Sequence, residues 1–450
     1  MTHGNGFAAS WGRRVAVAVS LIVLAGCGSS TTTTTTTTPT VSNTAPVTVG
    51  PLVPSTPYLP YVNGVYTSVT VCLPGTTVCQ IVPNILVDTG SVGLRVLYTA
   101  LGSLAPEMSL LTQGGTHDVL QECVQFADFS YVWGPVALAN IQIAGETALQ
   151  VPGSSLNVGV PMQLILTTPE FPVPESGSTN CLHTPPGSRL AVDANTVETL
   201  GANGILGVGL FPQDCGNACT PASGNPPNQY FYCSTTTGCA VALVPLENQV
   251  WNPVAAFSSS DTNGVLLSLP AVTASGSQSV AGSLIFGIGT QSDNSLGSAT
   301  IYAADEYGNF PSVVYNGVAY NSPANGSFID SGTTAYYFSD HTTLGIPECL
   351  DQSGHATGYY CPPTTLEFTV TPHGANGTTG SVGFSITNAS TLFASGNAAF
   401  SNLGGDSGTG VLTDYVDLGL PFFYGRKVFV GISGSTPPNN VSAPYGYWAF

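Results

Sequence analysis

The chain has 450 residues, of which 43% are hydrophobic and only 7% are charged, and it contains 53 glycines and 34 prolines. Its 24 acidic residues against 6 Lys and Arg give a formal net charge of −18 at pH 7. This charge excludes nucleic acid as a partner, because phosphate contacts need a basic face. The scarcity of charge and the abundance of glycine and proline favour strands and turns, so we expect a mainly all-β protein of two domains.

Residues 1–27 have the pattern of an export signal. Two arginines precede an apolar run over residues 15–24, and the run ends in Leu24-Ala25-Gly26-Cys27, which resembles a bacterial lipobox. We therefore expect Cys27 to carry a lipid. Because Gly28 follows it and not aspartate, the anchor is expected in the outer membrane, on the periplasmic or the cell-surface side. An ordinary secretory signal and an uncleaved anchor are the alternatives.

Residues 28–55 have the composition of a flexible tether. They consist largely of Thr, Ser, Pro and Val, with eight consecutive threonines at positions 31–38. Such a segment has too little apolar surface to offset the entropy lost on ordering it. We expect it to hold the folded part away from the membrane.

Ten cysteines remain besides Cys27, an even number that is typical of disulfides in an exported chain. A metal site is the alternative, but the histidines do not interleave with the cysteines at finger-like spacing. Ten cysteines allow very many connectivities, so the pairing stays a hypothesis. Proximity in sequence suggests Cys72 with Cys79, Cys123 with Cys181, Cys215 with Cys219, Cys233 with Cys239, and Cys349 with Cys361.

Two hairpins are expected in the first half of the chain. Residues 61–71 alternate in polarity, Pro74-Gly75 turns the chain, and residues 81–87 return it toward Asp88. The apolar and aromatic stretch over residues 124–143 has Gly134-Pro135 near its middle and fits a longer hairpin. Its tip is expected to hang over a cleft.

Two short segments, at residues 85–91 and 327–333, are almost the same. Each places an aspartate, Asp88 or Asp330, after an apolar run and before a hydroxyl, a glycine and a second hydroxyl. An isolated buried charge costs several kcal/mol unless hydrogen bonds or a shared proton relieve it. The duplication predicts two halves that bring their aspartates together, so that one proton is shared and a water between them is activated.

An apolar strand with a glycine follows each aspartate turn. The first contains Ile205-Leu206-Gly207, and the second contains Asp417-Leu418-Gly419. Glycine in such a strand permits close approach to another backbone. The repeated order predicts an N-terminal lobe at residues 56–255 and a C-terminal lobe at residues 256–450.

With both turns and both strands in view, the chain resembles a pepsin-like aspartic peptidase. The resemblance implies a bilobal double-β-barrel fold with a cleft between the lobes, no metal or other cofactor, and Asp88 and Asp330 as the catalytic dyad. It also implies supporting roles for the residues that follow each aspartate. Thr89 and Ser331 would brace the turns, Ser91 and Thr333 would bind the outer carboxylate oxygens, and Gly90 and Gly332 would permit the turn geometry.

The chain departs from the family pattern in three places. Arg95 stands where the first motif usually continues with Trp, and Asp417 stands where the family has an apolar residue. The hairpin that corresponds to the flap lacks the usual Tyr-Gly-Thr or Tyr-Gly-Ser. Tyr131 or Trp133 is the candidate to cover substrate instead, and Asp128 is the candidate partner of Arg95.

The leading hypothesis is a lipid-anchored, monomeric endopeptidase that favours acid and cleaves a peptide or protein substrate. A catalytically silent pepsin-like lipoprotein that binds or inhibits a partner is the second hypothesis, because fold does not fix function. An unrelated β-rich adhesin is the third. In an adhesin the two aspartates would lie far apart.

Overall fold

The structure is a computed structural model, and it describes residues 42–50, 61–154, 158–174, 181–182, 192–224, 227–323, 326–338, 345–407 and 415–450. The protein is mainly β, as expected, and residues 41–450 form one unit. The predicted signal and the lipid-bearing Cys27 lie outside the described residues. Among the described residues, no helix has both the length and the apolar character needed to cross a membrane.

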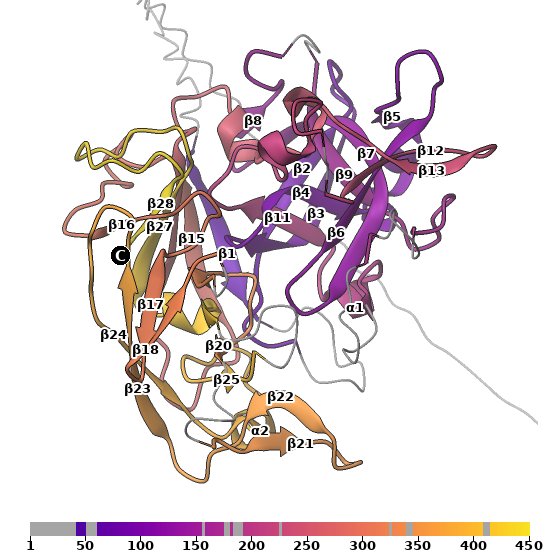
Figure 1. Ribbon diagram of the computed structural model, residues 1–450. Coiled ribbons are helices and arrows are strands. Elements are labelled where there is room, and N and C mark those ends of the chain that lie inside the picture. The colour runs from indigo at the N-terminus through magenta and orange to yellow at the C-terminus, as the bar shows by residue number, and fades with distance from the viewer. Residues whose placement is uncertain are drawn as a thin grey trace, which may run out of the picture. The chain divides into compact units, whose positions relative to one another are not determined.

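The strands form three sheets (Figure 1). The largest contains β1 (Thr44–Val49), β2 (Val65–Cys72), β3 (Cys79–Asp88), β4 (Val92–Leu97), β5 (Ser109–Leu110), β6 (Val119–Gln125), β7 (Ser130–Ile143), β8 (Glu146–Ala148), β9 (Val160–Ile165), β10 (Val192–Asp193), β11 (Gly204–Val208), β12 (Tyr230–Ser234), β13 (Gly238–Val241), β14 (Gly264–Leu269), β15 (Val280–Phe286), β16 (Ile301–Ala303), β27 (Arg426–Gly431) and β28 (Tyr447–Ala449).

The two smaller sheets come from the second half of the chain. One contains β17 (Ser312–Tyr315), β18 (Val318–Asn321), β23 (Leu366–His373) and β24 (Val382–Ile386). The other contains β19 (Phe328–Ile329), β20 (Tyr336–Phe338), β21 (Glu348–Leu350), β22 (Ala356–Tyr360), β25 (Gly404–Gly405) and β26 (Val416–Leu418). The described helices are short: α1 (Val197–Leu200), α2 (Ala389–Ala394), and the 3-10 helices η1 (Tyr98–Glu107), η3 (Gly216–Cys219), η4 (Leu246–Asn248), η5 (Pro253–Ala256) and η6 (Leu420–Phe423).

The predicted tether extends too far along the chain. Residues 44–49 form β1, which pairs antiparallel with all but the last residue of β15 and also with the start of β2. Ala45, Val47 and Val49 alternate with exposed residues and are buried, the pattern of a strand with one face on a core. The folded part therefore includes residue 44, and β1 joins strands from the two halves of the chain.

The first predicted hairpin is confirmed, and the second is correct only in part. Strands β2 and β3 pair with Cys72 opposite Cys79, and Asp88 is the last residue of β3. Strands β6 and β7 also form a hairpin, but it turns at residues 126–129, and Gly134-Pro135 lies inside β7. A Cβ on Gly134 would lie 1.8 Å from the carbonyl oxygen of Leu164, so this glycine permits close packing against β9 and does not mark a turn.

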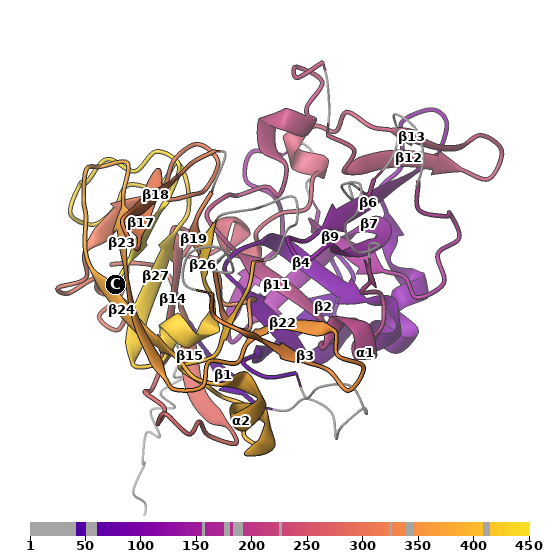
Figure 2. The ribbon, with the colours of Figure 1, turned by 60° about the horizontal axis from the view of Figure 1, so that its bottom comes forward.

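The described strands form the same three-strand arrangement in each half of the chain, and Figure 2 labels β3, β4 and β11 of the first unit and β19 and β26 of the second. Strand β11 runs parallel to β3 and antiparallel to β4, and β26 runs parallel to β19 and antiparallel to β20. Each aspartate thus leaves a strand that has the later apolar-glycine strand as a neighbour. Glycines 207 and 419 permit a close approach on the opposite side, because a Cβ on Gly207 would lie within 3 Å of the Val92 backbone in β4, and one on Gly419 would lie within 3 Å of the carbonyl oxygens of residues 333 and 335, next to β20.

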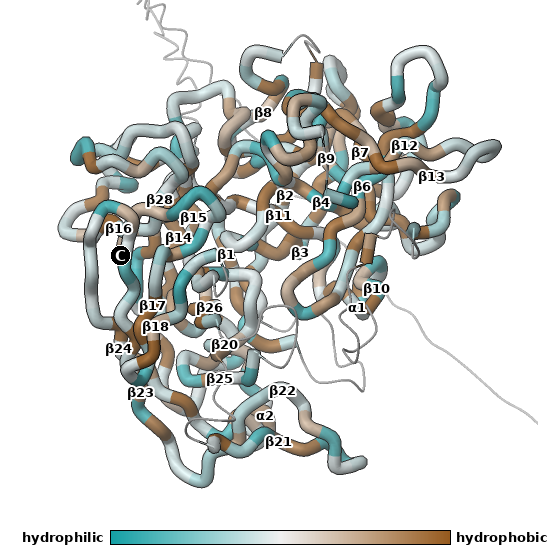
Figure 3. Tube along the Cα trace, in the orientation of Figure 1, coloured by the Kyte–Doolittle hydropathy of each residue, from teal (hydrophilic) through white to brown (hydrophobic). Residues whose placement is uncertain are grey.

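The main hydrophobic core contains residues from both halves. Val87 and Leu206 of the first half and Ile329 and Leu418 of the second belong to one cluster of buried side chains. Figure 3 shows the apolar segments along the central strands and hydrophilic segments in outer loops. All five disulfides that proximity suggested are present: Cys72–Cys79, Cys123–Cys181, Cys215–Cys219, Cys233–Cys239 and Cys349–Cys361.

Candidate active site

The structure brings Asp88 and Asp330 together. The backbone N–H of Gly90 lies 2.9 Å from Asp88 Oδ1 and 3.1 Å from Asp330 Oδ1, so one donor serves both carboxyls. The residues are 242 positions apart in sequence, and only the pairing of the two turns places them at a common donor. The large distance between the aspartates that was expected for an adhesin is wrong.

Each carboxyl is held by the residues that follow it. Asp88 accepts from the Gly90 and Ser91 N–H groups at Oδ1 and from the Ser91 hydroxyl at Oδ2. Asp330 accepts from the Gly332 N–H at Oδ1, over 2.7 Å, and from the Thr333 hydroxyl at Oδ2, over 2.9 Å. Ser91 and Thr333 therefore make the contacts expected of them. In both turns Oδ1 is the oxygen that lies toward the other half.

Thr89 and Ser331 join the two turns through reciprocal hydrogen bonds. The Thr89 N–H donates to the Ser331 hydroxyl over 3.1 Å, and the Ser331 N–H donates to the Thr89 hydroxyl over 2.9 Å. The Ser331 hydroxyl in turn donates to the carbonyl of Val87 over 2.7 Å. Both side chains are buried, so these bonds are shielded from water and fix one turn against the other.

Gly90 and Gly332 are needed because of what lies across the pair of turns. A Cβ on Gly90 would lie 2.4 Å from the carboxyl carbon of Asp330, and one on Gly332 would lie 2.7 Å from Asp88 Oδ1. Neither glycine has a positive φ. Their role is to let the opposite carboxyl approach, and turn geometry alone does not demand them.

The surroundings of Asp330 favour its protonated form. Burial raises the pKa of Asp330 well above its ordinary value, and the neighbouring carboxyls of Asp88 and Asp417 raise it further. Hydrogen bonds from the backbone oppose this shift only in part. A carboxyl that keeps its proton beside a second carboxyl is the arrangement that acid–base chemistry on a shared water requires.

Asp417 is a third carboxyl at the site. It is buried in β26, and the Thr333 hydroxyl lies 2.8 Å from its Oδ2 as well as 2.9 Å from Asp330 Oδ2. Its Oδ1 has no hydrogen-bond partner among the described residues. Burial raises the pKa of Asp417 well above its ordinary value. In sequence it stood out only as a polar residue at an apolar position.

Two tyrosines that sequence reasoning did not identify, Tyr61 and Tyr415, lie within electrostatic range of the dyad. The pKa of Tyr61 is raised, and burial is the largest cause. The nearby side chains of Tyr359, Asp128, Asp88 and Asp330 raise it further. Burial likewise dominates the raised pKa of Tyr415, with Asp417, Asp128 and Asp330 among the further causes. Since Asp128 lies in the turn between β6 and β7, this turn approaches the same tyrosines as the dyad does. Aromatic residues outside any motif gave no signal in the sequence.

The candidate flap residues are not free to close over a cleft. Trp133 is fully buried in β7, where its indole N–H donates to the carbonyl of Phe171 over 2.9 Å and its ring packs edge-on against Phe231. Trp133 as a cover for substrate is therefore wrong. Tyr131 is also buried, at 8% exposure. The turn itself carries Asp128, whose carboxylate accepts from the backbone N–H and the hydroxyl of Ser130.

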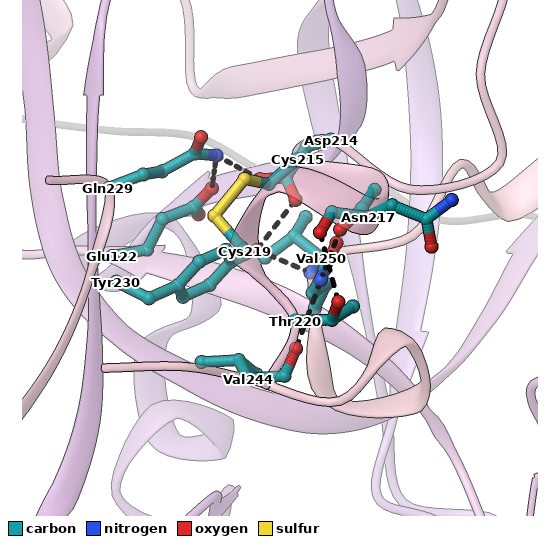
Figure 4. The surroundings of a disulfide bond; sticks show 12 residues. Glu122, Asp214, Cys215, Asn217, Cys219, Thr220, Gln229, Tyr230, Val244 and Val250 are labelled. Atoms are coloured by element: carbon teal, nitrogen blue, oxygen red, sulfur yellow. Dashed lines mark hydrogen bonds between the residues drawn. A yellow bond between two sulfur atoms is a disulfide. The ribbon is translucent and has the colours of Figure 1, made fainter. Parts of the chain in front are cut away.

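Arg95 pairs with Glu122 and Asp214, and the expected pairing with Asp128 is wrong. The Arg95 guanidinium lies 2.8 Å from Glu122 and 2.9 Å from Asp214, and all three side chains are buried. Gln229 donates to both carboxylates and the Tyr230 hydroxyl donates to Asp214, beside the Cys215–Cys219 disulfide (Figure 4). Asp214 is therefore a partner of a buried cation.

Comparison with known proteins supplies a family. A family model described as "Protein of unknown function (DUF3443)" matches residues 39–450, which is most of the chain. A search of the curated proteins returns no match.

Proposed function

The chain belongs to the DUF3443 family, whose description assigns no function, and we propose from its site that it is an aspartic endopeptidase. The observation that carries the proposal is the single Gly90 N–H that bonds the carboxyls of both Asp88 and Asp330. Two buried carboxyls at this range share a proton, and a water held between them has an acid on one side and a base on the other.

The geometry suggests how the steps divide. Asp330, whose pKa is raised by burial and by neighbouring carboxyls, holds the shared proton and donates it to the carbonyl oxygen of the scissile peptide. Asp88 accepts a proton from the attacking water, so that the new C–O bond gives a neutral tetrahedral diol. Asp88 then returns that proton to the leaving nitrogen as the C–N bond breaks, and Asp330 recovers its own proton from the diol. The brace between Thr89 and Ser331 keeps both carboxyls aligned throughout.

We also propose the finer fold, which is a pepsin-like pair of lobes divided near residues 255 and 256, with the substrate cleft between them. The duplicated three-strand units around β11 and β26 support this division. The five disulfides support an extracytoplasmic location. Lipid on Cys27, the outer membrane and a monomeric state complete the proposal.

The test is cleavage of a denatured protein by the purified full-length chain between pH 3 and pH 7, with and without pepstatin. Asp88→Asn and Asp330→Asn should each lower kcat/KM by roughly 10³-fold, because general acid–base catalysis contributes about 10² to 10⁴. Asp351→Asn makes the same chemical change at an exposed aspartate away from the site and is the matched control.

A silent binding lipoprotein is the competing candidate. The observation that favours it is the buried Trp133, which leaves the β6–β7 hairpin without the expected aromatic cover. A well-folded chain that cleaves nothing at any pH, or cleavage that survives both asparagine substitutions, would overturn the peptidase proposal and leave this one.

A further inference from the structure

The Thr333 hydroxyl makes two contacts that it cannot serve with one hydrogen. It lies 2.9 Å from Asp330 Oδ2 and 2.8 Å from Asp417 Oδ2, both carboxyl oxygens. A hydroxyl donates only once, so one of these oxygens must itself carry a proton and donate to Thr333. Either Asp417 is protonated and Thr333 donates to Asp330, or Asp330 is protonated and Thr333 donates to Asp417.

In the part of the chain that the structure describes, Asp417 has no ion-pair partner. Asp330 and Asp88 face it from the two turns, Tyr415 lies two residues away on its own segment, and Tyr337 is directly opposite it in β20. Aspartate and tyrosine side chains are either neutral or negative, so none of these neighbours is a cation. Asp417 is 3% exposed, and its Oδ1 has no hydrogen-bond partner among the described residues. A full negative charge there is costly unless a proton is shared.

The first half of the chain lacks this carboxyl. Ile205 occupies the position in Ile205-Leu206-Gly207 that Asp417 occupies in Asp417-Leu418-Gly419, and it is buried as an ordinary apolar side chain. The turn at Asp88 is held without any group of this kind. The turn geometry therefore does not require Asp417. The burial of a polar residue at this position needs a different explanation.

We propose that Asp417 is a positioning residue that shares one proton with Asp330 through the hydroxyl of Thr333, and so keeps the dyad protonated toward higher pH. This inference rests on the proposed function, which it extends. Asp417 does not touch substrate. It acts through Thr333 on the oxygen of Asp330 that faces away from Asp88, and leaves Oδ1 to share its hydrogen bonds across the dyad.

Asp417→Asn tests the inference, because it keeps the shape and a hydrogen bond to Thr333 but removes the charge and the titrating proton. The alkaline limb of the kcat/KM profile should move about one pH unit toward acid, the size of shift that one like charge at close range produces. Asp417→Ala should move the limb in the same direction. Asp261→Asn, which alters a buried aspartate held by Thr290 and Gln291, is the matched control and should leave the limb in place. A loss in kcat/KM that is equal at every pH would overturn the inference.

The pH dependence of unfolding tests the shared proton without any activity. The folded state raises the pKa of Asp417 by burial, so its contribution to stability is full below the unfolded pKa and is lost as pH rises through the folded one. The Tm of Asp417→Asn minus that of the wild type should therefore increase from pH 4 to pH 8. A difference in Tm that stays constant with pH would overturn the inference. This result does not depend on peptidase activity, so it separates failure of the inference from failure of the proposed function.

Discussion

The two aspartate turns hold their carboxyls in a similar way, but the strand behind the first carries a cation and the strand behind the second carries a carboxyl. Seven residues after Asp88 the chain has Arg95, and seven after Asp330 it has Tyr337. In the registers of the two units, Arg95 is opposite Ile205, and Tyr337 is opposite Asp417. The first half thus buries Arg95 together with two acidic partners of its own. The second half buries an additional carboxyl, that of Asp417, beside the dyad.

This difference teaches that a duplicated motif need not give two equivalent groups. Each turn holds its own carboxyl with a glycine N–H and a hydroxyl, yet Asp330 has Asp417 as an additional neighbour that favours its protonated form. A dyad needs such inequality, because one member must donate a proton while the other accepts one. In the proposed mechanism, the strands behind the turns, more than the turns themselves, assign the proton.

The largest effect is expected from removing the buried cation. Arg95→Met should lower the free energy of unfolding by about 3–5 kcal/mol, because it leaves Glu122 and Asp214 buried without their partner. Tyr337→Phe, at the equivalent position of the other half, should cost about 1 kcal/mol, the worth of a hydroxyl hydrogen bond. Urea unfolding at pH 7 measures both, and equal losses would contradict the asymmetry.

Gly90→Ala should cost more activity than any change outside the dyad. The new Cβ would meet the carboxyl carbon of Asp330 at 2.4 Å, so the carboxyls must separate. We expect kcat/KM to fall by about 10²-fold or more, since a displacement near 1 Å costs that much. Gly114→Ala adds the same methyl in open space and at a φ that is not positive, and should change nothing. If Gly90→Ala keeps full activity, the hydrogen bonds from the Gly90 N–H to both carboxyls are not needed for catalysis.

The brace between the turns is unequal in a way that can be measured. Ser331→Ala should cost about 2 kcal/mol in unfolding free energy, because the Thr89 N–H loses its acceptor and the Val87 carbonyl loses a donor at 2.7 Å. Thr89→Val should cost about 1 kcal/mol, because its hydroxyl donates only over 3.5 Å and chiefly accepts from the Ser331 N–H. If Thr89→Val proves the costlier change, the assignment of donors is wrong.

The smallest effect is a gradual change of stability with pH. Burial raises the pKa values of Asp330, Asp417, Asp214 and Glu146. Folded carboxyls of this kind bind protons more tightly than the unfolded chain does, so their contribution is present at acid pH and is lost as pH rises. Tm should rise when the pH is lowered from 8 to 5. A steady fall over that interval would show that carboxylates stabilised in their charged form dominate.

Residue order was enough to predict the parts that depend on neighbours in the chain. The alternation before Asp88, the residue types that follow each aspartate and the pairing of nearby cysteines all describe local geometry, and the structure agrees with them. The bracing of the turns by Thr89 and Ser331 was implied by the family resemblance, which rests on two short motifs that can each be recognised from neighbouring residues. The tether was the exception, because three alternating apolar residues in β1 are too few to stand out within a Thr-rich segment.

Tertiary structure alone decided the charges and the cover of the site. Arg95 finds its partners 27 and 119 residues away, and Asp417 reaches Asp330 through a hydroxyl 84 residues distant. Trp133 is buried because it packs into a cluster with Phe171 and Phe231, and Tyr61 lies within electrostatic range of the dyad in a segment with no motif. The sequence by itself determined which groups could react. Burial and the partners of each charge determined their protonation, because the cost of a buried charge depends on everything that the fold places within a few ångströms of it.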